Sequence, residues 1–163
     1  MMKDFSSWID LDCKSYYLDS KKRGIRVIVH EGVDVETVSR IRKYLWFVRK
    51  RYFFPIRCYI HLTDHEKYRS SGKGYCYGIF FPGQETPRRY PSIYLPSKQV
   101  ASNQVLYQLL FGLTRLLTYY YQWYLMCEEK YSHRSLEIEA TKAANYLVSE
   151  YFNEKRLEAA LSE

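Results

Sequence analysis

The sequence predicts an α+β domain in which a small, mainly antiparallel sheet packs on a long central helix and a C-terminal helix. Three patterns predict this fold: short apolar segments that alternate with polar residues, longer segments with helical periodicity, and Pro or Gly residues between them. The expected elements are, in chain order, a strand at 25–30, a helix at 35–51, strands at 56–62, 75–81 and 91–96, and helices at 102–126 and 135–157.

The first strand and the first helix are marked by local signals. Ile25, Val27 and Val29 occupy alternate positions, which is the two-residue period of a strand. Asp34 precedes the helix and is a good N-cap, because its side chain can accept a hydrogen bond from the first helical turn. The stripe expected to face the core consists of Val35, Val38, Ile41, Leu45 and Val48.

The later strands are separated from this helix by Pro55. In the second strand, two sets of alternating residues are expected on opposite faces. These sets are Cys58, Ile60 and Leu62, which suit the core, and Arg57, Tyr59 and His61. Residues 63–74 are a polar loop, and the connection at 82–91, marked by Pro and Gly, is expected to expose Arg88 and Arg89.

The long helix that follows is apolar enough to require a membrane test. Residues 105–126 form a run of 22 residues with one charge, Arg115, near the middle. An Arg at the centre of a bilayer costs about 2.5–3.5 kcal/mol on insertion scales. The central helix of a globular domain, capped by Ser102 or Asn103, is therefore favoured over a membrane span.

Length and cysteine content favour one domain in a reducing compartment. The 163 residues suffice for a single core, with a lead-in segment at 1–20 and a tail at 157–163. The first residues lack the apolar stretch of a signal peptide. The four cysteines (Cys13, Cys58, Cys76 and Cys127) form no CxxC pair. We therefore expect a cytoplasmic protein with reduced thiols.

The net charge of +7 is distributed unevenly. Residues 21–57 contain 11 Lys and Arg and three acidic residues, a net charge of +8, whereas residues 127–163 contain five and eight, a net charge of −3. The basic region is interleaved with aromatic residues and is suited to an anionic partner, although a solvated helix face has the same composition. The residues expected to bind a partner are Arg42, Lys43, Arg49, Lys50, Arg88, Arg89 and Tyr94.

Two segments near the C-terminus carry a resemblance to a known family. RLLTYYYQWY at 115–124 and SLEIEATKAANYLVSEYF at 135–152 resemble the site helices of the small gluzincin metallopeptidases of bacteria and their phages. In that family the first helix carries His-Glu-x-x-His, commonly followed by aromatic residues and Gln-Trp, and the second carries Glu-x-x-Ala. The resemblance covers roughly residues 25–155 and implies a minimal zincin-like domain.

The same resemblance implies that the zinc-binding residues have been replaced. The register is set by Thr118, Gln122 and Trp123. It places Arg115 and Tyr119 at the two His positions and Leu116 at the general-base position. Because Arg is cationic and cannot ligate a metal, the resemblance implies no zinc, no other cofactor and no peptidase activity.

Only the third ligand position keeps a carboxylate. Glu137 matches the Glu-x-x-Ala spacing, and Glu139 is the less suitable equivalent. A buried Glu137 without zinc would be an unpaired charge, so we expect an ion pair between Arg115 and Glu137, with a hydrogen bond from Tyr119. In the alternative, Arg115 simply extends to solvent.

These features predict a catalytically inactive, peptidase-like binding protein. The former substrate groove and an edge strand at 90–96, which contains Tyr94, are expected to hold a protein partner by strand addition. By analogy with small domains carried by phages and mobile elements, the partner would be a host or defence protein that this protein inhibits.

Three alternatives stay open. The first is a nucleic-acid-binding domain that uses the basic region at 21–57. The second is an enzyme of unrecognised chemistry. The third is a metal site at Cys58, His61, His65 and Cys76. This site is disfavoured because residues 58 and 61 of one strand face opposite ways, which leaves Cys58 to the core and His61 and His65 to the surface. His30 and His133 are interpreted as ordinary histidines.

Overall fold

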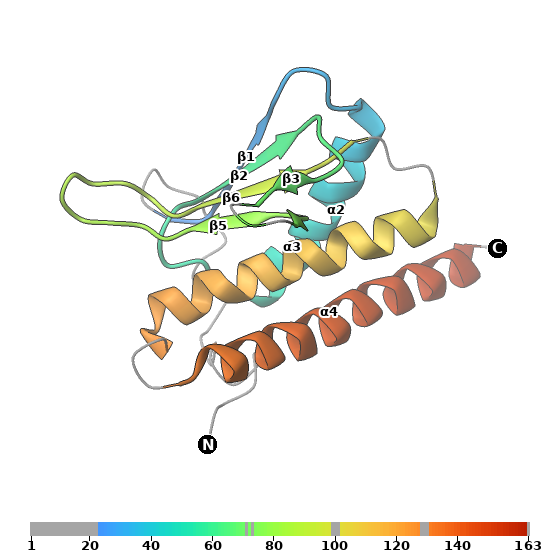
Figure 1. Cartoon of the computed structure of the whole chain (residues 1–163). Coiled ribbons are helices and arrows are strands. Elements are labelled where there is room, and N and C mark those ends of the chain that lie inside the picture. Colours follow the sequence, from blue (N-terminus) through green and yellow to red (C-terminus); the bar gives the residue numbers. More distant parts are fainter. Residues whose placement is uncertain (1–22, 71, 73, 99–101, 128–130, 163) are drawn as a thin grey trace.

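The computed structural model describes residues 23–70, 72, 74–98, 102–127 and 131–162, and confirms the α+β fold. The expected lead-in segment at 1–20, with Cys13, lies outside the described residues. Figure 1 shows the strands as one layer, with α3 beneath them and α4 against α3. The elements are β1 (Ile25–Val29), α2 (Val35–Arg51), β2 (Cys58–Thr63), β3 (Tyr68–Arg69), β4 (Tyr75–Cys76), β5 (Ile79–Phe81), β6 (Ser92–Pro96), α3 (Asn103–Tyr124) and α4 (His133–Ser162).

The main sheet is mixed, which corrects the expectation of a mainly antiparallel sheet. Its strand order is β1-β2-β6-β5. β1 pairs with β2 and β2 with β6 in parallel, whereas β5 runs antiparallel to β6. For β1 and β2 the cause is α2, because a helix between two strands returns the chain to the edge from which it started, and the next strand then runs in the same direction. β3 and β4 form a separate antiparallel ribbon.

The expectation of an edge strand at 90–96 is wrong. β6 pairs with β2 on one side and β5 on the other, so its backbone is already hydrogen-bonded along both sides. The edges of this sheet are β1 and β5. The strand expected at 75–81 is interrupted at Gly78, whose φ of +147° ends the extended conformation between β4 and β5.

Helix α2 has the predicted bounds and the predicted N-cap. The backbone N–H of Thr37 donates a hydrogen bond to Oδ2 of Asp34 at 3.1 Å. The predicted buried stripe is confirmed for Val38, Ile41, Leu45 and Val48. Val35 is the exception, since it is the first residue of the helix, at its N-terminal end, and is exposed.

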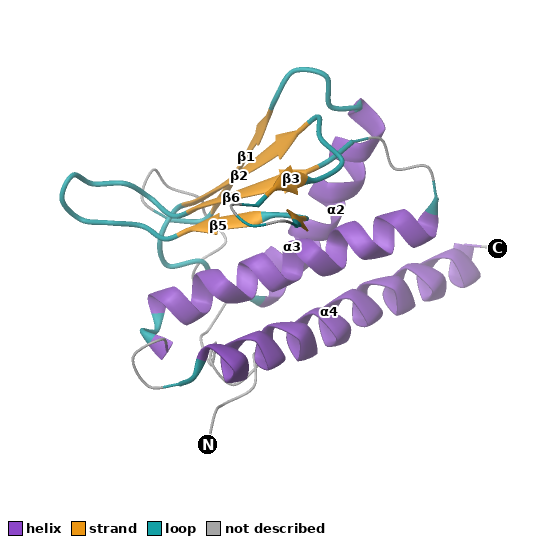
Figure 2. Ribbon diagram, in the orientation of Figure 1, coloured by secondary structure: helices purple, strands orange, loops and turns teal. Residues whose placement is uncertain are grey.

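Helices α3 and α4 run antiparallel to each other (Figure 2). Ser102 caps α3, as expected, by accepting a hydrogen bond from the backbone N–H of Val105. α4 continues to Ser162, because residues 157–161 are mostly strong helix formers where a tail was expected. Among the described helices, none has the length and apolar character that crossing a membrane requires.

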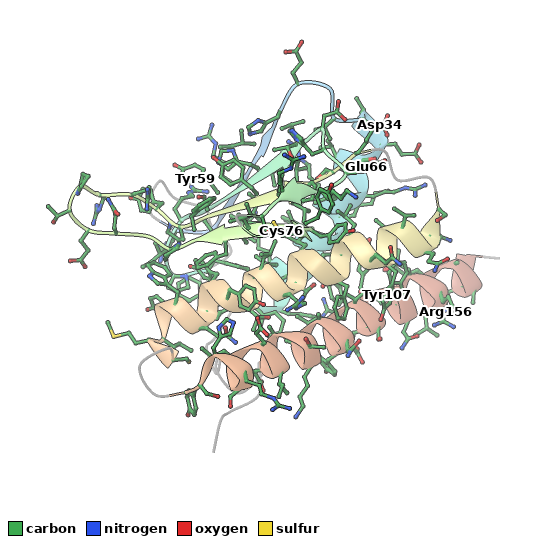
Figure 3. The ribbon with its side chains drawn as sticks, in the orientation of Figure 1. Asp34, Tyr59, Glu66, Cys76, Tyr107 and Arg156 are labelled. Atoms are coloured by element: carbon green, nitrogen blue, oxygen red, sulfur yellow. The ribbon has the colours of Figure 1, made fainter. Side chains whose placement is uncertain are left out.

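The described helices cover one face of the sheet, and none of them covers the other face, here called the open face. Cys58, Ile60 and Leu62 point into the core and are fully buried, as the alternation predicted. α4 packs on α3 from outside, and Tyr107 lies on α3 where the two helices meet (Figure 3). The Tyr107 ring stacks on that of Phe152 of α4, with 5.8 Å between ring centroids. The opposite face of the sheet carries Tyr59 and His61, which are both partly exposed.

Candidate functional site

Arg115 and Tyr119, which the family resemblance aligns with the two His ligands, lie on α3 and form a hydrogen-bonded pair. One turn of helix separates Arg115 from Tyr119, and Nη2 of Arg115 donates a hydrogen bond to the Tyr119 hydroxyl at 2.9 Å. Burial raises the pKa of Tyr119. The positive charge of Arg115 opposes that rise, and the negative charge of Glu137 adds to it. A guanidinium and a neutral phenol offer a metal ion no imidazole-like electron pair.

Leu116, at the general-base position, packs under the start of β5. It is buried, and a Cβ atom at position 78 would lie 2.5 Å from its Cδ1. The close approach is possible because residue 78 is glycine. An aliphatic side chain, which cannot act as a general base, therefore fills the space beside the edge strand.

The expected ion pair between Arg115 and Glu137 is not formed. Glu137 instead pairs with His133, whose Nε2 lies 3.0 Å from its Oε1. The Glu137 side chain is 48% exposed, so no buried charge requires neutralisation there. Nε of Arg115 is buried and has no hydrogen-bond partner within the described part of the chain.

The carboxylate of α4 that faces inward is that of Glu139, although the Glu-x-x-Ala spacing of the family motif indicated Glu137. Glu139 is 6% exposed and lies on the helix stripe that faces α3. The other members of this stripe are Leu136, Ala140, Ala143, Ala144, Leu147 and Val148. The helical period therefore decides between the two carboxylates, because position 137 falls outside the stripe. This signal was readable in the sequence and was outweighed by the motif spacing.

The cysteines and histidines considered for a second metal site do not converge. Cys58 is buried in the core, and burial raises the pKa of its thiol. His61 projects from the opposite face of the same strand, and Cys76 lies in β4. Among the described residues, no three His, Cys, Asp or Glu side chains are grouped as metal ligands would be.

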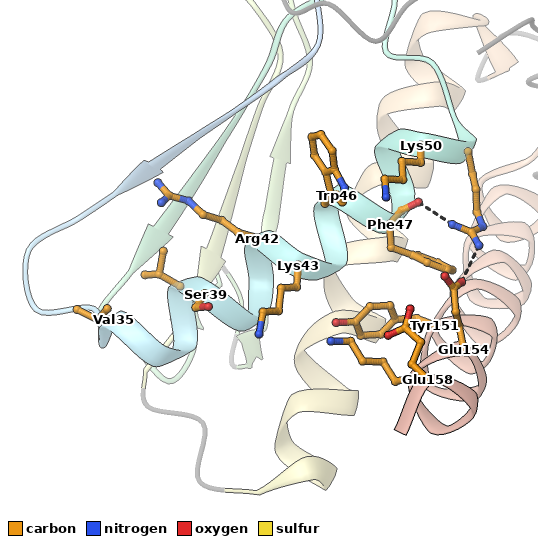
Figure 4. Close-up of a pocket in the computed structure, with 13 residues that line it drawn as sticks. Val35, Ser39, Arg42, Lys43, Trp46, Phe47, Lys50, Tyr151, Glu154 and Glu158 are labelled. Atoms are coloured by element: carbon orange, nitrogen blue, oxygen red, sulfur yellow. Dashed lines mark hydrogen bonds and ion pairs between the residues drawn. The ribbon is translucent and has the colours of Figure 1, made fainter. Parts of the chain in front are cut away.

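The predicted basic residues of α2 line a groove between α2 and α4, here called the α2–α4 groove. It has a volume of about 520 Å³. Arg42, Lys43 and Lys50 line it, and Trp46 stands between them with 55% of its surface exposed (Figure 4). Arg49 does not line the groove but lies over the Trp46 ring, 5.4 Å from its centroid.

The wall of the groove on α4 is partly acidic. Lys43 and Phe47 project toward Tyr151 and Glu158 of α4 (Figure 4). Arg51 bridges the two helices, since its Nη2 lies 2.7 Å from Oε2 of Glu154. The groove thus combines an aromatic floor with a rim that carries both signs of charge and an excess of cations.

The other predicted partner residues lie elsewhere. Arg88 and Arg89 are exposed in the connection before β6, and Arg88 lies 5.9 Å from the Tyr90 ring centroid. Tyr94 lies on the open face of the sheet, where its ring stacks on His61 at 4.2 Å. The seven predicted residues therefore do not form one surface.

A histidine pair on the open face was missed from the sequence. Nε2 of His30 and Nδ1 of His61 lie 2.9 Å apart. Burial lowers the pKa of His61, and the charge of His30 lowers it further. The two residues are 31 positions apart, and only the parallel pairing of β1 with β2 brings them together.

Comparisons with known proteins identified no similar protein. No family model, curated protein or solved structure matches the chain. The proposals below therefore depend on the geometry of the described side chains.

Proposed function

We propose that this protein is a non-catalytic binding protein with a zincin-like frame, and that it holds an acidic, amphipathic segment of a partner protein in the α2–α4 groove. The frame is supported by the arrangement of α3 and α4, which pack antiparallel beneath the short antiparallel strand β5. The absence of catalysis is supported by the chemistry of Arg115, Leu116 and Tyr119, which supply neither metal ligands nor a base.

The observation that carries the binding function is an exposed tryptophan surrounded by cations. Trp46 has Arg49 and Lys50 over its ring at 5.4 and 5.3 Å. A large exposed aromatic side chain is typical of the centre of a protein interface, and the surrounding cations select an acidic partner. Val35, which is 83% exposed, extends the apolar surface at the end of α2.

A protein segment fits this groove better than a nucleic-acid backbone. Its wall carries Glu158 and the Arg51–Glu154 ion pair. Glu158 would repel phosphates, whereas a protein partner can offer groups of both signs. The prediction that this protein is carried by a phage or mobile element and inhibits a host or defence protein stays a prediction.

The zincin-like frame is tested by rebuilding the metal site. The triple variant Arg115→His, Leu116→Glu and Tyr119→His should bind zinc if these positions match the family motif, because two imidazoles one turn apart would face a carboxylate of α4. The readout is zinc stoichiometry after dialysis, with Ala at the same three positions as the control. A folded triple variant that binds no more zinc than the control would contradict the frame.

The partner site is tested by charge reversal. The variant Arg42→Glu with Lys43→Glu, and separately Trp46→Ala, should lose a protein that the unaltered chain captures from its source cell. The matched control is Arg134→Glu with Lys142→Glu, which changes the same charge on exposed positions of α4. If the control loses the same protein, or if the groove variants retain it, the groove is not the site.

A further inference from the structure

The open face of the four-stranded sheet is a second surface with its own chemistry. The register places one set of side chains on this face, and none of them is buried. The set consists of Arg26, Ile28, Tyr59, His61, Ser92, Tyr94, Ile79 and Phe81. At a spacing of about 4.8 Å between strands, the face extends about 14 Å across the sheet.

An aromatic row crosses this face. The rings of His61 and Tyr94 are parallel, with centroids 4.2 Å apart, and Phe81 meets Tyr94 edge-on at 5.6 Å. His30 continues the row beyond His61, at 5.2 Å between ring centroids. Phe81 is 41% exposed, so the row has an accessible end. Exposed rings of this kind are surfaces on which unpaired bases stack.

A hollow of about 650 Å³ lies at the Phe81 end of the row. Tyr68 from the β3–β4 ribbon and Phe81 and Tyr94 from the sheet form its aromatic part. Lys67, Arg69 and Arg89 supply its positive charge, and none of its described lining residues is Asp or Glu. This all-cationic lining distinguishes the hollow from the α2–α4 groove, whose wall contains two glutamates.

The cations are placed for an external anion. Arg69 and Arg89 are exposed, and within the described chain neither makes an ion pair. Lys67 lies over the ring of Tyr75, with its Nζ 4.0 Å from the ring centroid. Arg69 and Arg89 thus present exposed positive charge beside aromatic rings, which is the combination that a phosphate attached to a base requires.

We propose that the open sheet face and its hollow bind single-stranded nucleic acid, with bases stacked on Phe81, which Tyr94 supports from within the row, and phosphates held by Arg69 and Arg89. A duplex is disfavoured because its bases are already stacked and paired, so they cannot enter the hollow. An acidic peptide is disfavoured because it would use the cations but leave the aromatic row without a flat partner. This site is separate from the groove proposed for a protein partner.

The test is fluorescence anisotropy with labelled oligo-U and oligo-dT of about 12 nucleotides, a duplex of the same length and a glutamate-rich peptide. Binding of the single strands should weaken about tenfold or more in Arg69→Glu with Arg89→Glu, and about fivefold or more in Tyr94→Ala. Tyr94→Phe keeps the ring and should bind as the unaltered protein does. Circular dichroism confirms that each variant is folded.

The groove variant Arg42→Glu with Lys43→Glu is the matched control, because it makes the same change in net charge at the other surface. Equal weakening by both double variants would show general electrostatic attraction and overturn the proposal. So would a glutamate-rich peptide that binds as tightly as the oligonucleotides, or single strands that show no binding at about 100 µM protein and about 50 mM salt. Preference for oligo-U over oligo-dT would assign the ligand to RNA.

Discussion

At the scale of single residues, tyrosine hydroxyls connect the helices to loop backbone in the core. The Tyr120 hydroxyl donates a hydrogen bond to the carbonyl of Ile56 at 2.6 Å and accepts one from its N–H at 2.9 Å. The Tyr121 hydroxyl donates to the carbonyl of Phe53 at 2.6 Å. Burial raises the pKa of Tyr120, so the hydroxyl stays neutral and can serve both groups. Part of the high tyrosine content therefore has a structural role.

The variant Tyr120→Phe tests this role. It leaves both backbone groups of Ile56 without their partner, and the free energy of unfolding should fall by about 1–3 kcal/mol. Urea denaturation followed by circular dichroism measures the change. Tyr146→Phe removes an exposed hydroxyl and is the matched control. Equal stability of the two variants would show that the Tyr120 hydrogen bonds contribute nothing.

The histidine pair makes stability depend on pH. Burial and the charge of His30 lower the pKa of His61 below its ordinary value of about 6.5. Below about pH 6.5 the unfolded chain binds a proton at His61 that the folded protein does not, so unfolding takes up a proton. The free energy of unfolding is therefore unaffected by this group above that pH and decreases as the pH falls below it. His61→Phe should flatten this fall between about pH 7 and 5 in urea titrations. His65→Gln is the control for loss of a surface histidine, and an unchanged slope in His61→Phe would refute the assignment.

At the scale of elements, the junction between β4 and β5 depends on one glycine. Gly78 has a φ of +147°, and a Cβ there would collide with Leu116 of α3. Glycine is therefore needed at this position for two reasons: the backbone conformation is unfavourable for other residues, and the edge strand lies in close contact with the helix.

Gly78→Ala should lower the free energy of unfolding by about 1–3 kcal/mol, because the new side chain is strained in this conformation and displaces Leu116. Gly72→Ala is the matched control, since a Cβ at position 72 meets no atom within 4 Å. The two midpoints in urea give the comparison. A Gly78→Ala protein as stable as its control would mean that the junction adapts without cost.

At the scale of the whole molecule, the layers depend on the contact between α3 and α4. Leu147 is 1% exposed and lies on the stripe of α4 that faces the core. Leu147→Ala should cost about 2–5 kcal/mol through lost burial and the cavity that remains. Leu161→Ala, at a position that is 87% exposed, should leave thermal stability nearly unchanged. If both variants melt together, α4 is not part of the cooperative core.

The two proposed binding surfaces are also a property of the whole molecule. The α2–α4 groove lies among the helices, and the aromatic row lies on the sheet face that the helices leave open. Their cations come from distant parts of the sequence: Arg42 and Lys43 from α2, and Arg69 and Arg89 from β3 and the connection before β6. The basic region at 21–57 therefore supplies the cations of the groove, whereas the cations that line the hollow lie outside that region.

Local patterns predicted those features that depend on neighbours in the chain. The Asp34 cap, the bounds of α2 and the alternation of Cys58, Ile60 and Leu62 are confirmed because the physical causes lie within one turn or one strand. The helical period of the buried residues of α4 also predicts that Glu139 faces inward, although the spacing of the family motif indicated Glu137. The zincin-like origin stays a prediction that the triple variant can test.

Tertiary structure decided whatever depends on residues far apart in the sequence. It set the parallel direction of β1, β2 and β6, enclosed β6 between two strands, and joined His30 to His61. It also left Arg115 and Glu137, which lie on different helices, without the pair that the aligned motif suggested. Each instead contacts a residue one turn away on its own helix, Tyr119 and His133 respectively. The reason is physical: strand order and side-chain partners are chosen by competition among all packing arrangements of the chain, whereas caps and periodicities are chosen by the backbone geometry of a few successive residues.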